Sequence, residues 1–408
     1  MRMTPQKSAR AGDELSVDIH SDLGEIRELW LNFEQIAKGG PHDTWEWANA
    51  WAQTAGKMCK PLIAIGKDAS DRVAFILPLT ICRHFDCNVL GWLGADQGNY
   101  SSGLFDLEAW SANDLPKGNE LMHLVLEALP HIDLVHLNKL PVEIGNQFNP
   151  LAGIAGIKEA SPGHTFPVSA DWEAMFNAKF SDSHKHKLRR NERRLADAGS
   201  LSLKKIESRA DRLKVLDEMF RSKKEWFAKR GITNFLDNED MRDFFKTLVQ
   251  SPDRDTGLTV SMFALCSGDE IIATNLGVIF QNRLYGLIAS TTSGPALRYG
   301  PGRVLFLRLV EQMSKDGIEM IDCGAGEDEN KLRWCTQERV RQHAILPITA
   351  KGHVYAATLK AALLAKLKIK QSPQLWNLTK RLRKWKAAIG PSKPAMACTP
   401  ASPARLQT

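Results

Sequence analysis

The sequence predicts an α/β fold with mixed sheets (α+β in character), divided into two domains and followed by a basic helical tail. The 408 residues are 43% hydrophobic and 25% charged, a globular composition at a length that suggests two or three domains. Short apolar runs alternate with amphipathic stretches of helical length. In the second half, three strands separated by SGD and QN turns lead into a helix, an order that favours a mixed sheet covered on both faces.

The first domain is expected to span residues 14–165. Its strands are predicted from β-rich apolar runs, and one of its helices begins at Asp43-Thr44 and carries three tryptophans. The predicted strands cover residues 15–20, 61–67, 72–85, 88–94 and 134–140, with a further one near Phe166, and the other predicted helices cover residues 23–37 and 115–129.

The second domain is expected to span residues 166–350. It begins with two helices, the second of which is strongly basic, and it contains the meander of three strands. The predicted helices start near residue 171 and cover residues 182–198, 210–229, 238–250 and 301–315, and the predicted strands cover residues 201–206, 258–265, 270–280, 283–290, 319–326 and 338–349.

Residues 351–408 form the predicted tail, which is helical to about residue 389 apart from a break at Ser372-Pro373. It contains twelve lysines and arginines and no acid, so the net charge of +7 arises from this segment and the other 350 residues sum to −5. Such asymmetry indicates an anionic partner, here an anionic membrane surface. Packing of the first tail helix on the amino-terminal domain remains open as the alternative. Two apolar stripes support these interpretations: Leu359, Leu363, Leu367 and Ile369, and then Leu375, Trp376, Leu378, Leu382 and Trp385.

Several classes of protein and site are excluded on sequence grounds. The seven cysteines show no CxxC spacing, which argues against a disulfide framework or a zinc site. His184 and His186 lack the i, i+4 spacing of helical metal ligands, so no metal is expected. No apolar run reaches eighteen residues, and the polar start lacks a secretory h-region. We therefore expect a cytoplasmic protein, peripheral on the inner membrane if the tail binds lipid.

Several sequence blocks resemble one known family. KHKLRRNERRL, SKKEWFAKRG, SGDEIIATNLGVIFQNRLYGLIAS and the stretch from RYGPGR to KLRW are similar to CelD-like (BcsL-like) acetyltransferases of cellulose and exopolysaccharide biosynthesis, and GWLGADQGNYSSGLF is similar to that family's amino-terminal part. The family falls in the acyl-CoA N-acyltransferase, or GNAT, superfamily. The resemblance implies two tandem GNAT-like domains, as in Fem-type transferases, and acetyl-CoA or another acyl-CoA as the co-substrate.

The turn before the helix at residue 301 is the candidate donor site. In GNAT folds the corresponding turn offers backbone N–H groups to the pyrophosphate of acyl-CoA, because a helix N-terminus has free donors and partial positive charge. The resemblance assigns this role to Arg298, Tyr299, Gly300, Gly302 and Arg303. The turn is one residue shorter than the usual superfamily signature, and a Pro-Gly helix start without a ligand remains open.

The acceptor side is expected after the strand that ends at Asp322. Acyl transfer needs a base near the acceptor, and Glu327 and Asp328 are the candidates. Lys331 is available to orient an anionic group, and the hydroxyl of Tyr285 to protonate the departing thiolate. The alternatives are a helix N-terminus with dipole-offsetting acids for the carboxylates, and a half-buried strand position for the tyrosine.

Substrate binding is also assigned to the two neighbouring helices. Arg190 and Arg194 share one face of the basic helix, and Trp226 lies on the helix after it. An anionic acceptor such as a lipid-linked sugar diphosphate, RNA, and a merely solvated helix face remain open. No DNA-binding motif accompanies the basic residues.

The function predicted from these features is transfer of an acyl group, in the first instance acetyl, from acyl-CoA to an amine or hydroxyl of a polysaccharide or cell-envelope precursor. Two alternatives stay open. One is a Fem-like transferase that uses aminoacyl-tRNA, and the other is a non-catalytic accessory protein of the polysaccharide-synthesis machinery.

Overall fold

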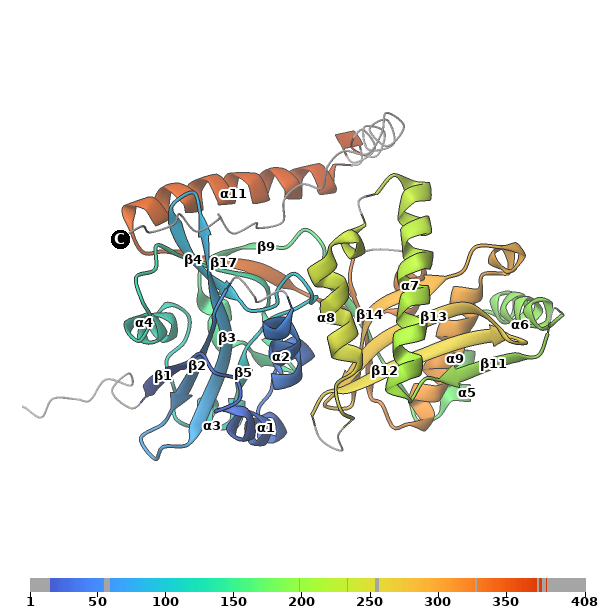
Figure 1. Ribbon diagram of the computed structural model, residues 1–408, viewed down its shortest axis with the longest axis horizontal. Helices are drawn as coiled ribbons and strands as arrows, with labels where there is room; N and C mark the ends of the chain where they lie inside the picture. Colours follow the sequence, from blue (N-terminus) through green and yellow to red (C-terminus); the bar gives the residue numbers. More distant parts are fainter. Residues whose placement is uncertain are drawn as a thin grey trace, which may run out of the picture.

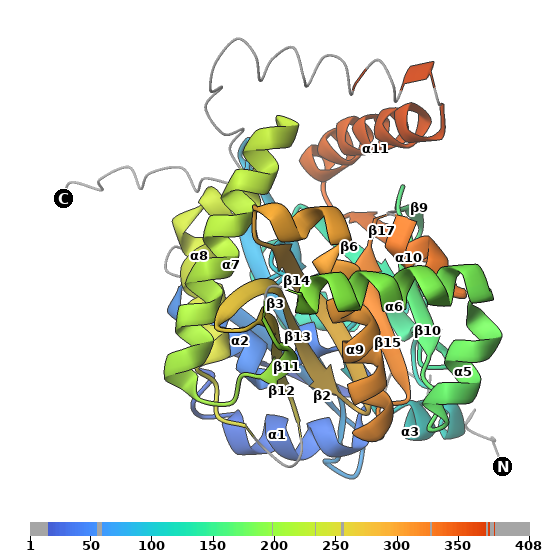
Figure 2. The same cartoon turned by 90° about the vertical axis from the view of Figure 1, so that its right-hand side faces the viewer.

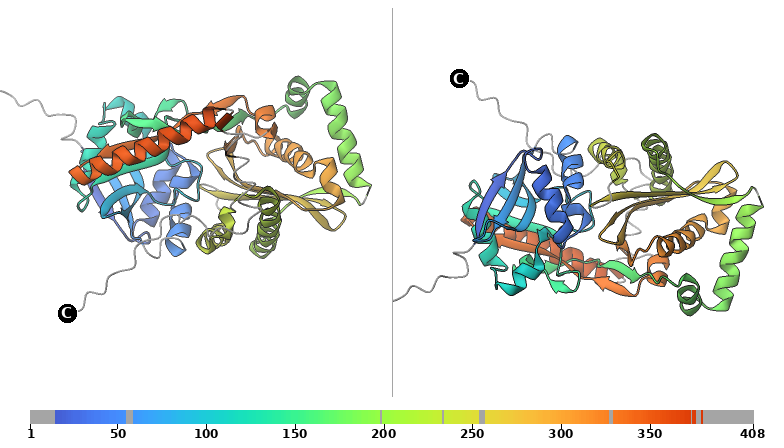
Figure 3. Two further views of the ribbon diagram at one scale, coloured as in Figure 1. Left: turned by 90° about the horizontal axis from the view of Figure 1, so that it is seen from above. Right: turned by 90° about the horizontal axis from the view of Figure 1, so that it is seen from below.

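The computed structural model places two α/β domains side by side, as Figures 1 and 3 show. The second apolar stripe of the tail, at Trp376, Leu378, Leu382 and Trp385, lies outside the described residues. The structure describes residues 15–54, 59–197, 199–232, 234–253, 257–326, 329–372, 374–375 and 379.

The first domain is built on a sheet with the order β1-β2-β3-β4-β6-β17-β9, to which β5 adds by pairing with β3. Its antiparallel hairpins come from the apolar runs expected as strands. The helix predicted over residues 115–129 is α4, and α3, which precedes it, was not predicted from the sequence. The strands are β1 (Ser16–His20), β2 (Pro61–Lys67), β3 (Val73–His84), β4 (Cys87–Trp92), β5 (Leu104–Phe105), β6 (Leu134–Pro141), β9 (Gly156–Lys158) and β17 (Arg341–Pro347), and the helices are α1 (Arg27–Ile36), α2 (Trp45–Gln53), α3 (Leu107–Ala112) and α4 (Asn119–Glu127).

The second domain is built on a sheet with the order β11-β12-β13-β14-β15-β10-β16. Helices cover both faces of this sheet, with α7 and α8 on one face and α9 on the other (Figure 3). The strands are β10 (Gly163–Pro167), β11 (Leu201–Lys205), β12 (Thr259–Ser267), β13 (Glu270–Phe280), β14 (Arg283–Thr291), β15 (Met320–Ala325) and β16 (Gln337–Arg339), and the helices are α5 (Trp172–Lys179), α6 (Asp182–Ala196), α7 (Arg209–Arg230), α8 (Glu239–Val249), α9 (Pro301–Lys315) and α10 (Glu329–Trp334).

The two sheets share one connection order. In each sheet, four strands pair antiparallel in succession: β1 to β4 in the first sheet and β11 to β14 in the second. A helix then leads to a strand that pairs parallel with the fourth one, which is β6 in the first sheet and β15 in the second. The helix in that connection is α4 in the first domain and α9 in the second. This repetition, which is not detectable as identical residues, confirms the mixed α/β fold predicted from the sequence.

The chain returns to the first domain after completing the second. β17, drawn in orange among the blue and green strands of Figure 1, pairs with β6 and β9 of the first sheet. We predicted one strand over residues 338–349, within a second domain at 166–350. The structure divides that segment, because β16 pairs with β10 in the second sheet whereas β17 joins the first.

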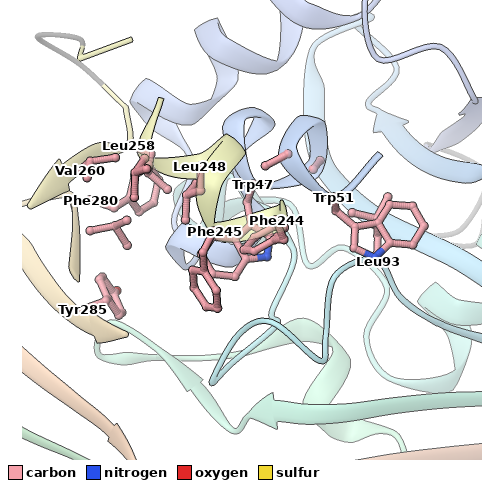
Figure 4. Close-up of a cluster of buried hydrophobic side chains, with 14 of the residues drawn as sticks. Trp47, Trp51, Leu93, Phe244, Phe245, Leu248, Leu258, Val260, Phe280 and Tyr285 are labelled. Carbon is pink, nitrogen blue, oxygen red and sulfur yellow. The ribbon is translucent and has the colours of Figure 1, made fainter. Parts of the chain in front are cut away.

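A single apolar cluster joins the two domains. The rings of Trp47 on α2 and Phe244 on α8 lie with centroids 4.8 Å apart, and both side chains are buried (Figure 4). The cluster continues from Trp51 and Leu93 of the first domain to Val260 of the second. Burial of large aromatic side chains gives the largest apolar stabilisation per residue, so the domains are packed together by a shared core.

The tail begins with α11 (Ala350–Gln371), which lies along the first domain (Figure 3). Leu359 and Leu363 pack against a small buried cluster that includes Val89 and Ile345. For this helix the structure therefore agrees with the alternative that its leucine stripe covers the amino-terminal domain. None of the described helices is long and apolar enough to cross a membrane.

Candidate active site

The strands β14 and β15 separate at the centre of the second sheet. Their parallel pairing ends at Tyr285 and Asp322, whereas β14 continues to Thr291. The β13–β14 register passes from Gly277↔Gly286 to Leu276↔Ile288, so Leu287 is the extra residue of a β-bulge. A bulge leaves its extra residue outside the hydrogen-bond ladder and re-aims the strand. Beyond Tyr285, the edge of β14 that faces β15 is therefore open. The backbone at Leu287, outside the hydrogen-bond ladder, lies in this open stretch.

A cleft of ≈ 360 Å³ lies at the end of this opening, where β14 leads into α9. It is bounded by α7, by the middle of β13, by the last residues of β14 and by the first turns of α9. Helix α9 starts at Pro301, which has no N–H, and the N–H groups of Arg303 and Val304 donate to the carbonyl of Gly300. The N–H of Gly302 therefore remains at the helix start, and the residues that line the cleft include no acid. The lining residues are Ser222, Lys223, Trp226, Thr274, Asn275, Ala289, Ser290, Thr291, Leu297, Gly300, Pro301, Gly302, Arg303, Leu305 and Phe306.

Four of the residues that the sequence suggested meet in this cleft: Trp226, Gly300, Gly302 and Arg303. Gly300 caps α9 in the left-handed conformation, with φ 65°, which favours glycine. A Cβ atom at Gly302 would lie 3.1 Å from Thr291 Cγ2, so the absence of a side chain keeps the passage between α9 and β14 open.

Two residues of the candidate donor turn lie elsewhere. The guanidinium of Arg298 is exposed and lies over the ring of Tyr299, 4.7 Å from its centroid. Tyr299 packs against the cluster that covers the α9 face of the sheet. Neither residue lines the cleft, so their assignment to the donor remains a prediction.

Asp322 is held at the domain interface by three hydrogen bonds. The Tyr100 hydroxyl donates to Oδ1 at 2.9 Å, the Gly324 N–H donates to Oδ1 at 2.8 Å, and Arg339 Nη1 donates to Oδ2 at 3.2 Å. The Asp322 side chain is 1% exposed. Burial, and then the charge of Asp322, raise the pKa of Tyr100, which therefore stays a donor. A Cβ at Gly163 would overlap the Tyr100 hydroxyl, so glycine is required there.

His42 lies next to this group, with its ring centroid 6.3 Å from that of Tyr285. The Asn99 N–H donates to His42 Nε2 at 3.4 Å. Burial, supported by the nearby charge of Lys139, lowers the pKa of His42 to about 3, so the imidazole is neutral. Tyr285 itself is buried in the shared core (Figure 4).

A second polar chain runs across β6, β17 and the end of β9 in the first sheet. His136 Nε2 lies 3.1 Å from His343 Nδ1, and His343 Nε2 lies 3.1 Å from Glu159 Oε1. Burial alone would raise the pKa of Glu159, but the hydrogen bond from His343 and the charge of Arg341 hold it at about 2. Burial also lowers the pKa of His136 to about 4.

The lowered pKa values of His42 and His136 lead us to expect that the protein becomes less stable as the pH falls. The folded pKa values of His42 and His136 lie below 6.5, so the unfolded chain binds more protons as the pH falls. We expect the free energy of unfolding to decrease between pH 6.5 and about pH 4, by several kcal/mol at about 1.4 kcal/mol per pKa unit. Urea unfolding at pH 7 and pH 4.5 measures this.

The matched variants for that experiment are His136→Gln and His186→Gln. His136→Gln should flatten the pH dependence, whereas His186 is exposed on α6 and its replacement should leave the dependence intact. An unchanged slope in His136→Gln would show that this histidine does not contribute.

The proposed acceptor residues are only partly within the described structure. Glu327 and Asp328 lie outside the described residues. Lys331, on α10, donates from Nζ to the carbonyl of Ala325 at 2.7 Å and so folds back over the end of β15. It lies at the same strand end as Asp322, as the sequence suggested.

The basic helix α6 runs across α9 on the far side from α7 (Figure 2). Glu192 on its inner side accepts from Arg308 Nε of α9 at 2.7 Å. Arg190 and Arg194 are exposed, and Arg194 pairs with Asp197 at 3.4 Å. Neither arginine lines the cleft, so their assignment to the substrate remains a prediction.

Comparison with known proteins identifies the second domain. Residues 182–332 match the family model described as Acetyltransferase (GNAT) domain. This chain carries a GNAT acetyltransferase domain. The protein is accordingly an acyltransferase, and the cleft at the start of α9 lies within the GNAT domain. No curated protein sequence matches the chain.

Solved structures are similar to this chain over most of its length. FemX is similar at a TM-score of 0.52 and 9% identity, over 81% of this chain and 97% of that one. L-PGS from Bacillus licheniformis has a TM-score of 0.46 and 11% identity, over 83% of this chain and 96% of that one. A tandem GNAT protein from the clavulanic acid biosynthesis pathway has a TM-score of 0.40 and 9% identity, over 82% and 98%. The FemX likeness shows a shared fold over 81% of this chain.

Proposed function

We propose that the protein transfers an acyl group, in the simplest case acetyl, from acyl-CoA to an amine or hydroxyl of a polysaccharide or cell-envelope precursor. The observation that carries this proposal is the cleft at the start of α9, which lies inside the GNAT domain and opens onto the edge of β14. The backbone N–H of Gly302 at the helix start would hold the pyrophosphate, with Arg303 beside it. The thioester arm would then follow β14 toward Tyr285.

The chemistry would be direct attack of the acceptor on the thioester. The bulge at Leu287 supplies a backbone N–H outside the ladder, suited to polarise the thioester carbonyl where the strands part. Tyr285 lies two residues before this bulge and is the proposed donor of a proton to the departing thiolate. Proximity of donor and acceptor in one opening would supply much of the rate acceleration.

Asp322 is unsuited to act as the base, because Tyr100, Gly324 and Arg339 already occupy its carboxylate. Glu327 and Asp328, at the end of the same strand, remain the proposed bases on sequence grounds. We expect Glu327→Gln to lower kcat by about 100-fold or more while acyl-CoA binding stays nearly unchanged, because a general base acts on the acceptor. Steady-state kinetics with calorimetric titration of acetyl-CoA measures both quantities.

Glu338→Gln is the control, since Glu338 is an exposed acid on β16. It should retain full turnover. Full activity in Glu327→Gln would move the base to another residue, with Asp328 first.

A second candidate donor is aminoacyl-tRNA. It is favoured by the fold shared with FemX and by the exposed basic face of α6. Calorimetry with acetyl-CoA and coenzyme A separates the two donors. Binding of either at micromolar concentration supports the proposal, whereas salt-dependent binding of tRNA without coenzyme A binding would favour the alternative. Binding of neither would favour a non-catalytic accessory role.

A further inference from the structure

The floor of the cleft holds a buried polar group that the protein does not satisfy. Asn275, in the middle of β13, is 6% exposed, and its Oδ1 accepts no hydrogen bond in the part of the chain that the structure describes. The residue lines the cleft together with the start of α9. Burial of an amide oxygen without a donor is unfavourable for stability. Such a group in a ligand-sized cleft points to a partner supplied by the ligand.

The neighbours of Asn275 explain why it is left unpaired. Thr274 Oγ1 and Ser290 Oγ lie 2.7 Å apart and bond to each other. Ala289 is the register partner of Asn275 on β14 and is too small to cover it. Beyond Tyr285, β14 has lost its pairing with β15, so the edge of β14 opposite to β13 carries no strand there.

Asn275 lies on the path that a donor arm would take. A ligand whose phosphates lie at Gly302 and whose reactive end lies near the bulge at Leu287 must follow the last residues of β14. Ala289 belongs to that stretch, and Asn275 is directly across the ladder from it. The arm therefore passes Asn275 between its phosphate end and its reactive end.

We propose that Asn275 is a donor-specificity residue that accepts a hydrogen bond from an amide N–H of a phosphopantetheine arm. This inference rests on the proposed function, since it takes acyl-CoA as the donor. The arm of coenzyme A carries two secondary amides, each with the N–H that Oδ1 lacks. Adenosine 3′,5′-bisphosphate has the nucleotide, the 3′-phosphate and the first phosphate of the pyrophosphate, but no arm. The contact selects donors that carry amides along the arm, and it does not discriminate between acyl groups.

Asn275→Leu tests the assignment by two measurements, the unfolding temperature of the unliganded protein and the affinity for coenzyme A. Leucine has a similar shape and no polar atoms, so thermal unfolding of the unliganded variant should occur at an equal or higher temperature. Calorimetry should show coenzyme A binding weakened by about tenfold, the typical worth of one hydrogen bond to a buried group. Affinity for adenosine 3′,5′-bisphosphate should stay unchanged. A purely structural asparagine would instead show a lower unfolding temperature.

Ser261→Ala is the matched control. Ser261 on β12 is also buried, and its Oγ has no partner among the described residues, but it does not line the cleft. Its replacement should leave coenzyme A binding unchanged. Should Asn275→Leu fail to fold, Asn275→Ala provides the same comparison of coenzyme A with adenosine 3′,5′-bisphosphate.

The outcomes separate this inference from the proposed function. If the unaltered protein binds no coenzyme A, the acyl-CoA donor itself is wrong. If the unaltered protein binds coenzyme A and Asn275→Leu binds it as tightly, the donor stands and the role of Asn275 is overturned. Equal weakening for coenzyme A and adenosine 3′,5′-bisphosphate would also overturn it, because the loss would then not depend on the arm.

Discussion

Gly302→Asp should abolish acyl-CoA binding while the protein remains folded. The new carboxylate would lie in the passage between α9 and Thr291, where even a Cβ approaches to 3.1 Å. Two negative charges about 4 Å apart repel by about 4 kcal/mol at an effective dielectric of 20, so affinity should fall by about 100- to 1000-fold. The fold should tolerate the change, because an acid in the first turn is favourable for a helix. Calorimetric titration of acetyl-CoA measures the affinity.

The control for charge is Gln312→Asp, a half-buried position on the same helix, about three turns from the cleft. It should bind acetyl-CoA as the unaltered protein does. Unchanged affinity in a folded Gly302→Asp protein would show that the start of α9 is not the donor site.

Asp322→Ala should be strongly destabilising. Removal of this carboxylate leaves the guanidinium of Arg339, whose side chain is 16% exposed, without its buried partner. Breaking a buried ion pair from one side typically costs about 3–5 kcal/mol. Tyr100→Phe, which removes one hydrogen bond to the same carboxylate, should cost about 1.5–3 kcal/mol. Urea unfolding measures both free energies.

Two further variants test whether the loss of stability comes from leaving a buried charge without its partner. Asp322→Leu combined with Arg339→Met removes both charges and should recover most of the stability lost in Asp322→Ala. Asp197→Ala breaks the exposed pair with Arg194 and should change the free energy of unfolding by no more than about 1 kcal/mol. A loss below about 1 kcal/mol in Asp322→Ala would mean that the pair is solvated and does not hold the domains.

The sequence predicted the elements of the second domain well, because their signals are local. Helix α7 ends at Gly231 in the left-handed conformation, and α9 starts at Pro301, as glycine and proline indicate. The three strands of the meander lie where the SGD and QN turns place them. The cleft residues Gly300, Gly302 and Arg303 follow from the same local pattern.

The interface residues could not be predicted, because they are far apart in sequence. Tyr100 and Asp322 are 222 residues apart, and no periodicity marks such a pair. Asn275 reads as an ordinary strand residue until its neighbours are known. The GADQGNYSS loop was noted only for its resemblance, although it supplies Asn99 and Tyr100 to the interface. The split between β16 and β17 likewise depends on partners more than 170 residues earlier.

The return of the chain through β17 constrains how the domains can move. The chain crosses between them twice, and the crossings run side by side, because Gly163 pairs with Arg339 and Lys158 pairs with Gln342. Arg341 ties them further by donating to the carbonyl of Ser161 at 2.7 Å. A single flexible linker would allow one domain to swing freely, whereas a two-stranded ribbon resists bending and yields mainly by twisting. Relative motion of the two domains is therefore expected to be a small torsion about this ribbon, and the second domain cannot be cut away at one peptide bond.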